Sequence, residues 1–370
     1  MGLNDFVYPG ALHTRFHHAL GAMHLMSVVL QNLQRKGQRI SDHEFESLLI
    51  TILLHDIGHG PFSHALESTL LPQGNHEEVS LIIMQHLNQK YQGRLKTALE
   101  IFQKQYHQPF FHQLVSSQLD IDRLDYLQRD SFFTGVSEGT IGSDRIINML
   151  NVKDGQLVVE EKGIYSIENF LNARRLMYWQ VYLHKTSVAA EKMMVSLIRR
   201  ARHLFNRGIE VPCTKELKMF LERPVETREL AVEPLLLQAY CQIDDYDIWS
   251  GIKSWQHHSD LVLSNISKMF LNRDLFQIKM SLQPIDVDVV QLKAKINSQF
   301  GIDNPDDLEF LLCQGVISNA AYISGDTGIS ILNKQGTILD IARASDLPNI
   351  AALGKIVKKH YLTWPKSVTL

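Results

Sequence analysis

The sequence has few cysteines, no long apolar run and no excess of charge of one sign. Three cysteines, Cys213, Cys241 and Cys313, occur in 370 residues, and no two of them form a Cys-x-x-Cys pair. Such sparse thiols are typical of a reduced, cytoplasmic protein rather than of a disulfide framework. The apolar runs are much shorter than the roughly 18 residues that a membrane helix needs, so we expect no membrane span.

A signal peptide and a global basic field are also missing. Residues 1–20 contain His13, Arg15, His17 and His18 where a signal peptide would have its apolar stretch. The formal net charge is −3 at pH 7. Nucleic acid is therefore not the expected partner, although a local basic patch is left open.

Histidine, by contrast, is abundant and unevenly placed. Of 17 histidines, 12 lie within residues 1–112. Because histidine is the commonest protein metal ligand and a general acid or base near neutral pH, we expect the chemistry in the N-terminal third of the chain.

Apolar residues recur at spacings of three and four, which predicts a mainly α fold. We expect helices at residues 15–33, 42–57, 77–90, 95–106, 112–131, 143–150, 167–206, 214–221, 227–241 and 259–272. The helix at 42–57 begins with a capping box, Ser41 with Glu44, and is ended by Gly58 and Gly60.

The C-terminal tail has a different character. Strands are predicted there at residues 275–282, 308–313, 320–324 and 329–333, with a turn at 333–336. Two further short strands, at 156–159 and 163–165, are predicted within the helical region. We therefore divide the chain into a helical domain, residues 1–273, and a smaller C-terminal α+β lobe, residues 274–370.

Four polar side chains are predicted to face the interior from three helices. His18 continues the apolar stripe of the first helix, His55 and Asp56 continue that of the second, and Asp122 shares a face with Tyr126. Burying an unpaired carboxylate costs free energy, and one bound divalent cation removes that cost. Two imidazoles and two carboxylates suit Mn²⁺, Fe²⁺, Ni²⁺, Zn²⁺ or Mg²⁺ without selecting among them.

By themselves these four residues leave both a metal site and an ordinary polar core open. The segment Leu54-His-Asp-Ile-Gly-His-Gly-Pro-Phe-Ser-His64 favours the metal site. It crowds three histidines and an aspartate into eleven residues, and a structural core rarely accepts so many titratable groups.

Several motifs resemble, in order and spacing, those of the HD-domain deoxynucleoside triphosphate triphosphohydrolases. That family includes the human SAM-and-HD-domain enzyme and bacterial HD phosphohydrolases. The motifs are Arg15-Phe-His-His-Ala-Leu-Gly21, His55-Asp-Ile-Gly-His-Gly-Pro-Phe-Ser-His64, Asn75-His76-Glu77, Asp120-Ile-Asp-Arg-Leu-Asp-Tyr126 and Arg129-Asp130. The likeness runs from about residue 5 to about 190, and more loosely to about 280. It implies an HD core at about 12–135 and substrate-binding helices at about 143–273.

The resemblance implies a role for each matching residue. The metal would be held by His18, His55, Asp56 and Asp122. The catalytic residues would be His76, acting as general acid or base, Glu67, which orients it, and His59 beside the phosphates. His64 would also contact phosphate. The alternative for the three histidines is hydrogen-bonded support of the metal ligands.

The same likeness implies a nucleotide site. Tyr126 and Asp130, one and two helical turns beyond Asp122, would contact the sugar. The remaining substrate contacts would be Arg15, Arg174, Tyr182, His184 and Lys185, with the arginines and the lysine on the triphosphate. The alternatives are a salt-bridged helix face formed with Arg123 or Arg129, and a solvated face at Arg174 and Arg175.

We therefore expect a metal-dependent phosphohydrolase that converts a deoxynucleoside triphosphate to deoxynucleoside and triphosphate. Alternatives are an HD phosphohydrolase acting on a nucleoside monophosphate or a signalling nucleotide, and a non-catalytic nucleotide or single-strand sensor. By analogy, the protein would form dimers or tetramers. The family's arginine-rich stretch ending in Gln-Leu-Gly does not precede Met1, so either the chain is truncated or the stretch is not needed. Without it we expect weaker substrate binding and different regulation.

Overall fold

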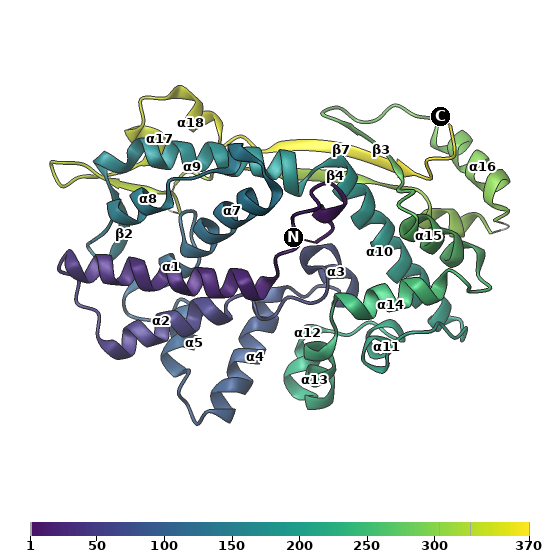
Figure 1. The fold of residues 1–370 in the computed structure, drawn as a ribbon, viewed down its shortest axis with the longest axis horizontal. Coiled ribbons are helices and arrows are strands. Elements are labelled where there is room, and N and C mark those ends of the chain that lie inside the picture. The colour runs from purple at the N-terminus through teal and green to yellow at the C-terminus, as the bar shows by residue number, and fades with distance from the viewer. Residues whose placement is uncertain (1, 303, 326, 370) are drawn as a thin grey trace.

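The computed structural model describes residues 2–302, 304–325 and 327–369. Helices dominate the described chain, which confirms the mainly α fold class (Figure 1). The helices of the N-terminal half are α1 Arg15–Arg35, α2 Asp42–Leu54, α3 Glu67–Leu70, α4 His76–Lys90, α5 Lys96–Phe102, α6 Pro109–Val115, α7 Ile121–Thr134, α8 Ser143–Met149 and α9 Ile164–Met177. Those that follow are α10 Lys185–Asn206, α11 Lys215–Leu221, α12 Thr227–Val232, α13 Pro234–Gln242, α14 Asp245–Trp255, α15 Leu261–Leu271, α16 Val289–Phe300, α17 Ile341–Ala344 and α18 Pro348–Ala352.

Shorter turns and strands connect these helices. The strands are β1 Leu150–Lys153, β2 Gln156–Glu160, β3 Gln277–Ser281, β4 Cys313–Asn319, β5 Ser330–Leu332, β6 Ile338–Asp340 and β7 Val357–Trp364. The tight helical turns are η1 Asn4–Phe6, η2 Ser63–Ala65, η3 Ser137–Gly139, η4 Glu161–Gly163, the π-helical η5 Tyr178–Tyr182, and η6 Pro305–Phe310.

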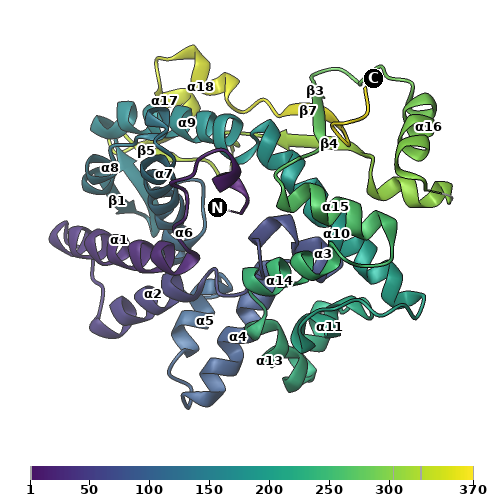
Figure 2. The ribbon, with the colours of Figure 1, turned by 45° about the vertical axis from the view of Figure 1, so that its right-hand side comes forward.

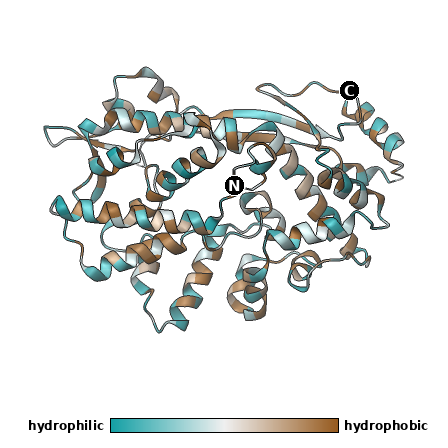
Figure 3. Ribbon diagram, in the orientation of Figure 1, coloured by the Kyte–Doolittle hydropathy of each residue, from teal (hydrophilic) through white to brown (hydrophobic). Residues whose placement is uncertain are grey.

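Capping explains where the first two helices begin. The Thr14 side chain accepts from the backbone N–H of His17 at the start of α1, and Ser41 with Glu44 forms the predicted capping box at the start of α2. Each cap satisfies backbone donors that a helix leaves unpaired at its first turn. Both helices then bury apolar stripes and pack on each other, while α1 also packs on α7. Figure 3 shows hydrophilic and hydrophobic residues alternating along the helices.

The single helix predicted at residues 112–131 is wrong, because the chain breaks between α6 and α7. Asp120 is fully buried in the break, and its carboxylate accepts from the backbone N–H groups of Ser117 (2.8 Å) and Arg123 (2.7 Å). The side chain competes for backbone donors and so starts a new helix. Asp122 consequently lies in the first turn of α7 rather than in the middle of a helix.

The long helix predicted at residues 167–206 is also interrupted. A π-helical turn follows α9, where the Leu183 N–H donates to the Tyr178 carbonyl at 2.8 Å. The helix restarts when the His184 side chain accepts from the N–H of Thr186. Apolar periodicity continues through this interruption, so the residue pattern does not reveal it.

Two small sheets have the strand orders β1-β2-β5-β6 and β3-β7-β4. The first pairs β2 with β5 in parallel, with Val159 opposite Ile331. Strands predicted at 156–159, 275–282 and 329–333 are confirmed, as is the turn at 333–336. Those at 163–165 and 320–324 are wrong, and residues 308–313 are mainly the turn η6, with β4 beginning only at its end.

Among the described residues, apolar side chains form two large hydrophobic cores and a small cluster around Met84. The helices that form the two large cores can be followed in Figures 1 and 2. One contains α1, α2, α6 to α9 and the first sheet; the other centres on α10 to α15. The C-terminal tail contributes to both, since Tyr322 and Ile331 join the first core and Trp364 joins the second. The division at residue 273 stays a prediction. Among the described residues, no helix combines the length and apolar character needed to cross a membrane.

A buried arginine ties three elements of the second core together. Arg200 on α10 is 3 % exposed at its side chain, and it donates to Asp260 before α15 (2.6 and 3.0 Å) and to Asp307 in η6 (2.5 and 3.0 Å). Every partner in this network would lose a counter-charge if the arginine were removed.

Replacing this arginine should destabilise the fold strongly. Because Arg200→Ala leaves buried carboxylates uncompensated, we expect the free energy of unfolding to fall by about 3–5 kcal/mol. The neighbouring Arg199, whose pair with Glu309 is largely exposed, is the matched control, and Arg199→Ala should change it by less than about 1 kcal/mol. Urea denaturation followed by circular dichroism measures both, and equal losses would contradict the role of the network.

Candidate active site

A cavity of about 510 Å³ collects most of the predicted site residues. Its lining includes Arg15, His18, His55, Asp56, His59, His64, His76, Asp122, Tyr126, Asp130 and Tyr182. Side chains of both cores contribute, so the cavity lies where the two cores meet. The lining residues come from positions 2 to 191, so the cavity depends on tertiary packing rather than on local sequence.

Small residues let the histidine-rich segment fold against α4. A Cβ atom on Gly58 would lie 2.2 Å from the His76 carbonyl oxygen and 2.3 Å from the Ser80 nitrogen, so only glycine allows this approach. Phe62 and Ser63 have positive φ angles of 53° and 55°, which turn the chain towards α3. The four histidines at 55, 59, 64 and 76 thus reach one cavity.

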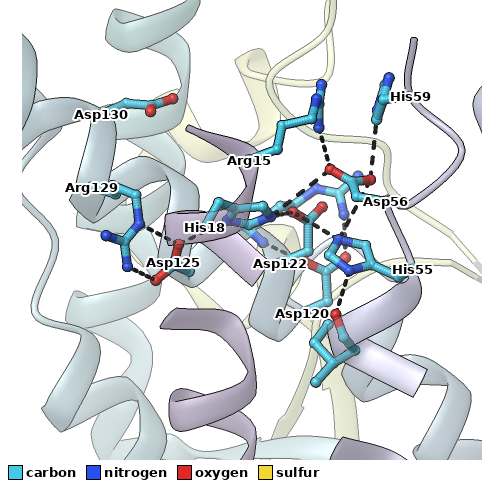
Figure 4. Close-up of polar contacts among 12 residues, drawn as sticks. Arg15, His18, His55, Asp56, His59, Asp120, Asp122, Asp125, Arg129 and Asp130 are labelled. Atoms are coloured by element: carbon cyan, nitrogen blue, oxygen red, sulfur yellow. Dashed lines mark hydrogen bonds and ion pairs between the residues drawn. The ribbon is translucent and has the colours of Figure 1, made fainter. Parts of the chain in front are cut away.

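The four predicted metal ligands converge from α1, the end of α2 and the first turn of α7 (Figure 4). Asp122 Oδ1 lies 3.1 Å from His18 Nε2 and 3.5 Å from His55 Nε2. Asp56 lies 3.6 Å from His55 Nε2 and 4.0 Å from His18 Nε2. Two imidazole nitrogens and two carboxylates therefore face a common point.

Hydrogen bonds on the far side of each ring fix the direction of the ligating nitrogens. His18 Nδ1 donates to Asp125 Oδ2 at 2.8 Å, and His55 Nδ1 donates to the Ile52 carbonyl at 2.6 Å. The Nε2 lone pairs are then left for the centre, and His55 Nε2 is buried without a hydrogen-bond partner. A buried orphan acceptor beside two carboxylates is what a cation would satisfy, so the residues fit a divalent metal.

Electrostatics supports the same conclusion. Burial alone lowers the pKa of His18, but Asp122 and Asp125 outweigh it and raise the pKa to about 10. Burial alone raises the pKa of Asp122, but His18 and His55 hold it well below its usual value. Both shifts favour a positively charged His18 beside an anionic Asp122, so the cluster suits positive charge.

Two arginines reach the cavity wall beside this cluster. Arg15 donates from Nη1 to Asp56 and from Nε to Ser63 Oγ, the latter at 2.8 Å. Arg123, which the sequence reading considered only as a partner in a salt-bridged face, also lines the cavity and pairs with Asp120. Arg123 stands next to Asp122 in the quoted motif, and that adjacency is the signal that could have found it.

Three of the predicted substrate residues do not line the cavity. Arg174 is 9 % exposed, and its Nε and Nη1 atoms are buried without hydrogen-bond partners. Lys185 is exposed, and the His184 side chain caps α10 instead. Arg174 lies on α9 before the interruption and Lys185 lies after it at the start of α10, so the two do not belong to one continuous helix face.

The predicted dyad is formed. Glu67 Oε1 accepts from His76 Nδ1 (2.8 Å) and from the His76 backbone N–H (2.5 Å), and Glu67 Oε2 accepts from His64 Nδ1 (2.9 Å). Burial opposes ionisation of Glu67, but bonds from His64 and His76 lower its pKa, so it stays anionic. His59 stacks on His76, with ring centroids 3.8 Å apart, and burial with nearby Arg15 lowers the His59 pKa.

The opposite wall is aromatic and carries one further carboxylate. Tyr182 Oη donates to Asp130 Oδ2 at 2.7 Å, and His13 Nε2 lies 2.6 Å from Asp130 Oδ1. Tyr126 packs between His18 and Tyr182. Arg129 pairs with Asp125, not with Asp130, so the alternative of a salt-bridged face at Asp130 does not hold among the described contacts. His13 was missed by sequence reasoning, and Tyr178, which also lines the cavity, was not among the predicted substrate residues.

Comparisons with known proteins agree with this geometry. The HD domain family matches residues 15–130, and the HD associated region matches residues 141–210. A crystal structure of a phosphohydrolase from Bacteroides thetaiotaomicron is 50 % identical, with a TM-score of 0.93, over 98 % of this chain and 90 % of that one. The chain belongs to the HD-domain phosphohydrolase family. HD domains are metal-dependent, and the converging donor set is consistent with that property.

Other relatives of this HD-domain protein are more distant. The uncharacterized protein YwfO of Bacillus subtilis is 29 % identical over all of this chain and 84 % of its own length. The deoxynucleoside triphosphate triphosphohydrolase SAMHD1 homolog of Dictyostelium discoideum is 28 % identical over 64 % of this chain and 49 % of its own length. The family is thus related to the SAMHD1 enzymes.

Neutralising Asp125 should weaken metal binding without touching a predicted ligand. Asp125→Asn removes the charge that makes the His18 ring more basic and orients it, so we expect metal affinity to fall roughly 10–100-fold. Asp144→Asn, at an exposed position in the first turn of α8, is the control. Competition with a chelator, read by elemental analysis, measures the affinity. An unchanged value for Asp125→Asn would show that this bond does not shape the site.

Proposed function

We propose that this HD-domain protein hydrolyses deoxynucleoside triphosphates to deoxynucleoside and triphosphate. The observation that carries the proposal is the cavity lined by the His18, His55, Asp56 and Asp122 cluster, by His76, whose Nδ1 is held by Glu67, and by the Asp130–Tyr182 wall. A centre for phosphate chemistry and a surface for a sugar therefore lie in one space. The SAMHD1-named relatives act on deoxynucleoside triphosphates by their names, which supports the substrate class.

In this proposal one divalent ion, Mn²⁺, Fe²⁺, Ni²⁺, Zn²⁺ or Mg²⁺, is held by His18, His55, Asp56 and Asp122. When bound, such an ion polarises a phosphoryl oxygen and lowers the pKa of water. Arg15 stands beside Asp56 and neutralises phosphate charge, and His59 and His64 add hydrogen-bonding groups. These residues bind the α-phosphate next to the cluster.

The His76–Glu67 pair moves the proton. Because Glu67 holds Nδ1 of His76, the Nε2 atom of the ring faces the substrate. Water attacks the α-phosphorus and the bond to the 5′-oxygen breaks. We assign His76 the transfer of a proton to this leaving oxygen, and Glu67 the orientation of the ring. His59, stacked on His76, keeps that ring in place.

The aromatic wall binds the sugar. Tyr126 and Tyr182 offer ring faces, and the Asp130 carboxylate accepts a hydrogen bond from a sugar hydroxyl. In the proposal, Arg174 and Lys185, which do not line the cavity, contact the triphosphate from beyond its wall, and His184 is a further substrate contact. A protein oligomer and a cytoplasmic location stay predictions.

The placement of Arg174 and Lys185 away from the cavity wall favours a second candidate. A nucleoside monophosphate carries less charge than a triphosphate, and the two arginines that line the cavity, Arg15 and Arg123, match it better. This rival is an HD phosphohydrolase that releases orthophosphate.

Product identification separates the candidates. The metal-loaded full chain is incubated with each deoxynucleoside triphosphate and monophosphate, and products are resolved by anion-exchange chromatography and ³¹P NMR. Inorganic triphosphate with free deoxynucleoside supports the proposal. Orthophosphate released only from the monophosphate supports the rival, and nucleotide binding without turnover supports a sensor.

Loss of the dyad histidine should reduce turnover more than binding. For His76→Ala we expect kcat to fall about 10²–10⁴-fold with little change in KM, because general acid–base catalysis contributes about that much. His86→Ala, at an exposed position on the same helix, is the control and should retain full activity. Steady-state rates of triphosphate release give kcat and KM for each variant. A normal kcat for His76→Ala would exclude His76 as the group that transfers the proton.

A further inference from the structure

The carboxylate of Asp130 is held from both sides. Its Oδ1 lies 2.6 Å from His13 Nε2, and its Oδ2 accepts from the Tyr182 hydroxyl at 2.7 Å. Asp130 is 6 % exposed, and the side chain of His13 is 4 % exposed. Two neighbours from distant parts of the chain thus fix the plane of one cavity-lining carboxylate.

His13 is itself fixed by packing. Its ring stacks on Phe133 at the end of α7, with centroids 4.6 Å apart and planes 25° apart. The preceding Gly10 lies so close to the Phe133 carbonyl that a Cβ atom would be 2.7 Å from its oxygen. The segment before α1 is therefore pressed against the C-terminal end of α7, and the imidazole is aimed at Asp130.

This arrangement carries a penalty that packing alone does not explain. His13 Nδ1 is buried without a hydrogen-bond partner, and an unsatisfied buried polar atom costs free energy. An apolar side chain would cover Phe133 without that cost. What the imidazole adds is its Nε2–H, which donates to Asp130 Oδ1.

We infer that His13 is a positioning residue that, with Tyr182, fixes the Asp130 carboxylate to read a free hydroxyl on the substrate's sugar. The inference rests on the proposed function. Each carboxylate oxygen has two acceptor sites. After His13 and Tyr182 take one on each oxygen, a site on each remains. Only a hydrogen-bond donor can occupy these remaining acceptor sites, so the carboxylate accepts from a sugar O–H. A sugar that carries phosphate in place of this hydroxyl is repelled by the negative charge of Asp130.

The test compares substrates with and without the hydroxyl. Steady-state kcat/KM is measured for the deoxynucleoside triphosphate that turns over fastest and for its 2′,3′-dideoxy analogue. We expect wild type to prefer the deoxy substrate. His13→Ala should reduce that preference at least tenfold by slowing only the deoxy substrate, and the loss should lie mainly in KM.

Three further variants make the result specific. His13→Gln keeps an N–H donor and should restore most of the preference. In an Asp130→Asn background, His13→Ala should not change the preference for the deoxy substrate any further. The effects of two residues that act through one contact do not add. His24→Ala, at an exposed position on α1, should behave as wild type. If His13→Ala does not fold, His13→Gln and His13→Leu provide the same comparison.

The outcomes separate this inference from the proposed function. If wild type hydrolyses deoxynucleoside triphosphates and His13→Ala slows both substrates equally, His13 is only structural and the inference fails alone. If wild type neither hydrolyses nor binds deoxynucleotides, measured by calorimetry, the proposed function fails and the inference fails with it. A selective loss that His13→Gln rescues supports both.

Discussion

The site depends on two hydrogen bonds that point away from it. Asp125 and the Ile52 carbonyl hold the Nδ1 atoms of His18 and His55, and each ring is thereby turned so that its Nε2 faces Asp122. Arg129 in turn holds both oxygens of Asp125. The direction of the lone pairs is thus set by α1, α2 and α7 packing together, and a shift of any of these helices would scatter the donors.

The same helix that supplies Asp122 also orders the rest of the cavity. Asp122, Tyr126 and Asp130 follow one another at intervals of four residues along α7, so they share one face over about 12 Å of helix. In the proposed function, phosphate chemistry lies at the N-terminal end of this stripe and hydroxyl recognition at its C-terminal end. His13, in the segment before α1, contacts Asp130 at the C-terminal end of the stripe. His18, five residues later, lies beside Asp122 at the N-terminal end.

Local signals in the sequence predicted α1, α2 and α4 well, because capping boxes and apolar stripes are properties of neighbouring residues. The converging donors His18, His55, Asp56 and Asp122 could be predicted from helical phase, and the family likeness added the His76–Glu67 contact.

Other features could not be read in that way. The break before α7 depends on the buried Asp120 carboxylate, and the π-helical turn at η5 leaves the apolar periodicity intact. The displacement of Lys185 follows from that turn. His13 was missed because its partner, Asp130, is 117 residues away and only tertiary packing joins them.

The pairing of β2 with β5 has a consequence for how the chain matures. Val159 of β2 can pair with Ile331 of β5 only after the ribosome has synthesised the chain between them. Ribosomes add about 5–20 residues per second. During roughly ten seconds or more of synthesis, β2 presents an open edge with the apolar Val159 beside it. The N-terminal helices can assemble their donors in that interval, but their sheet is completed only as the last part of the polypeptide emerges. Biogenesis of this protein therefore includes a period in which β2 needs shielding from other nascent chains.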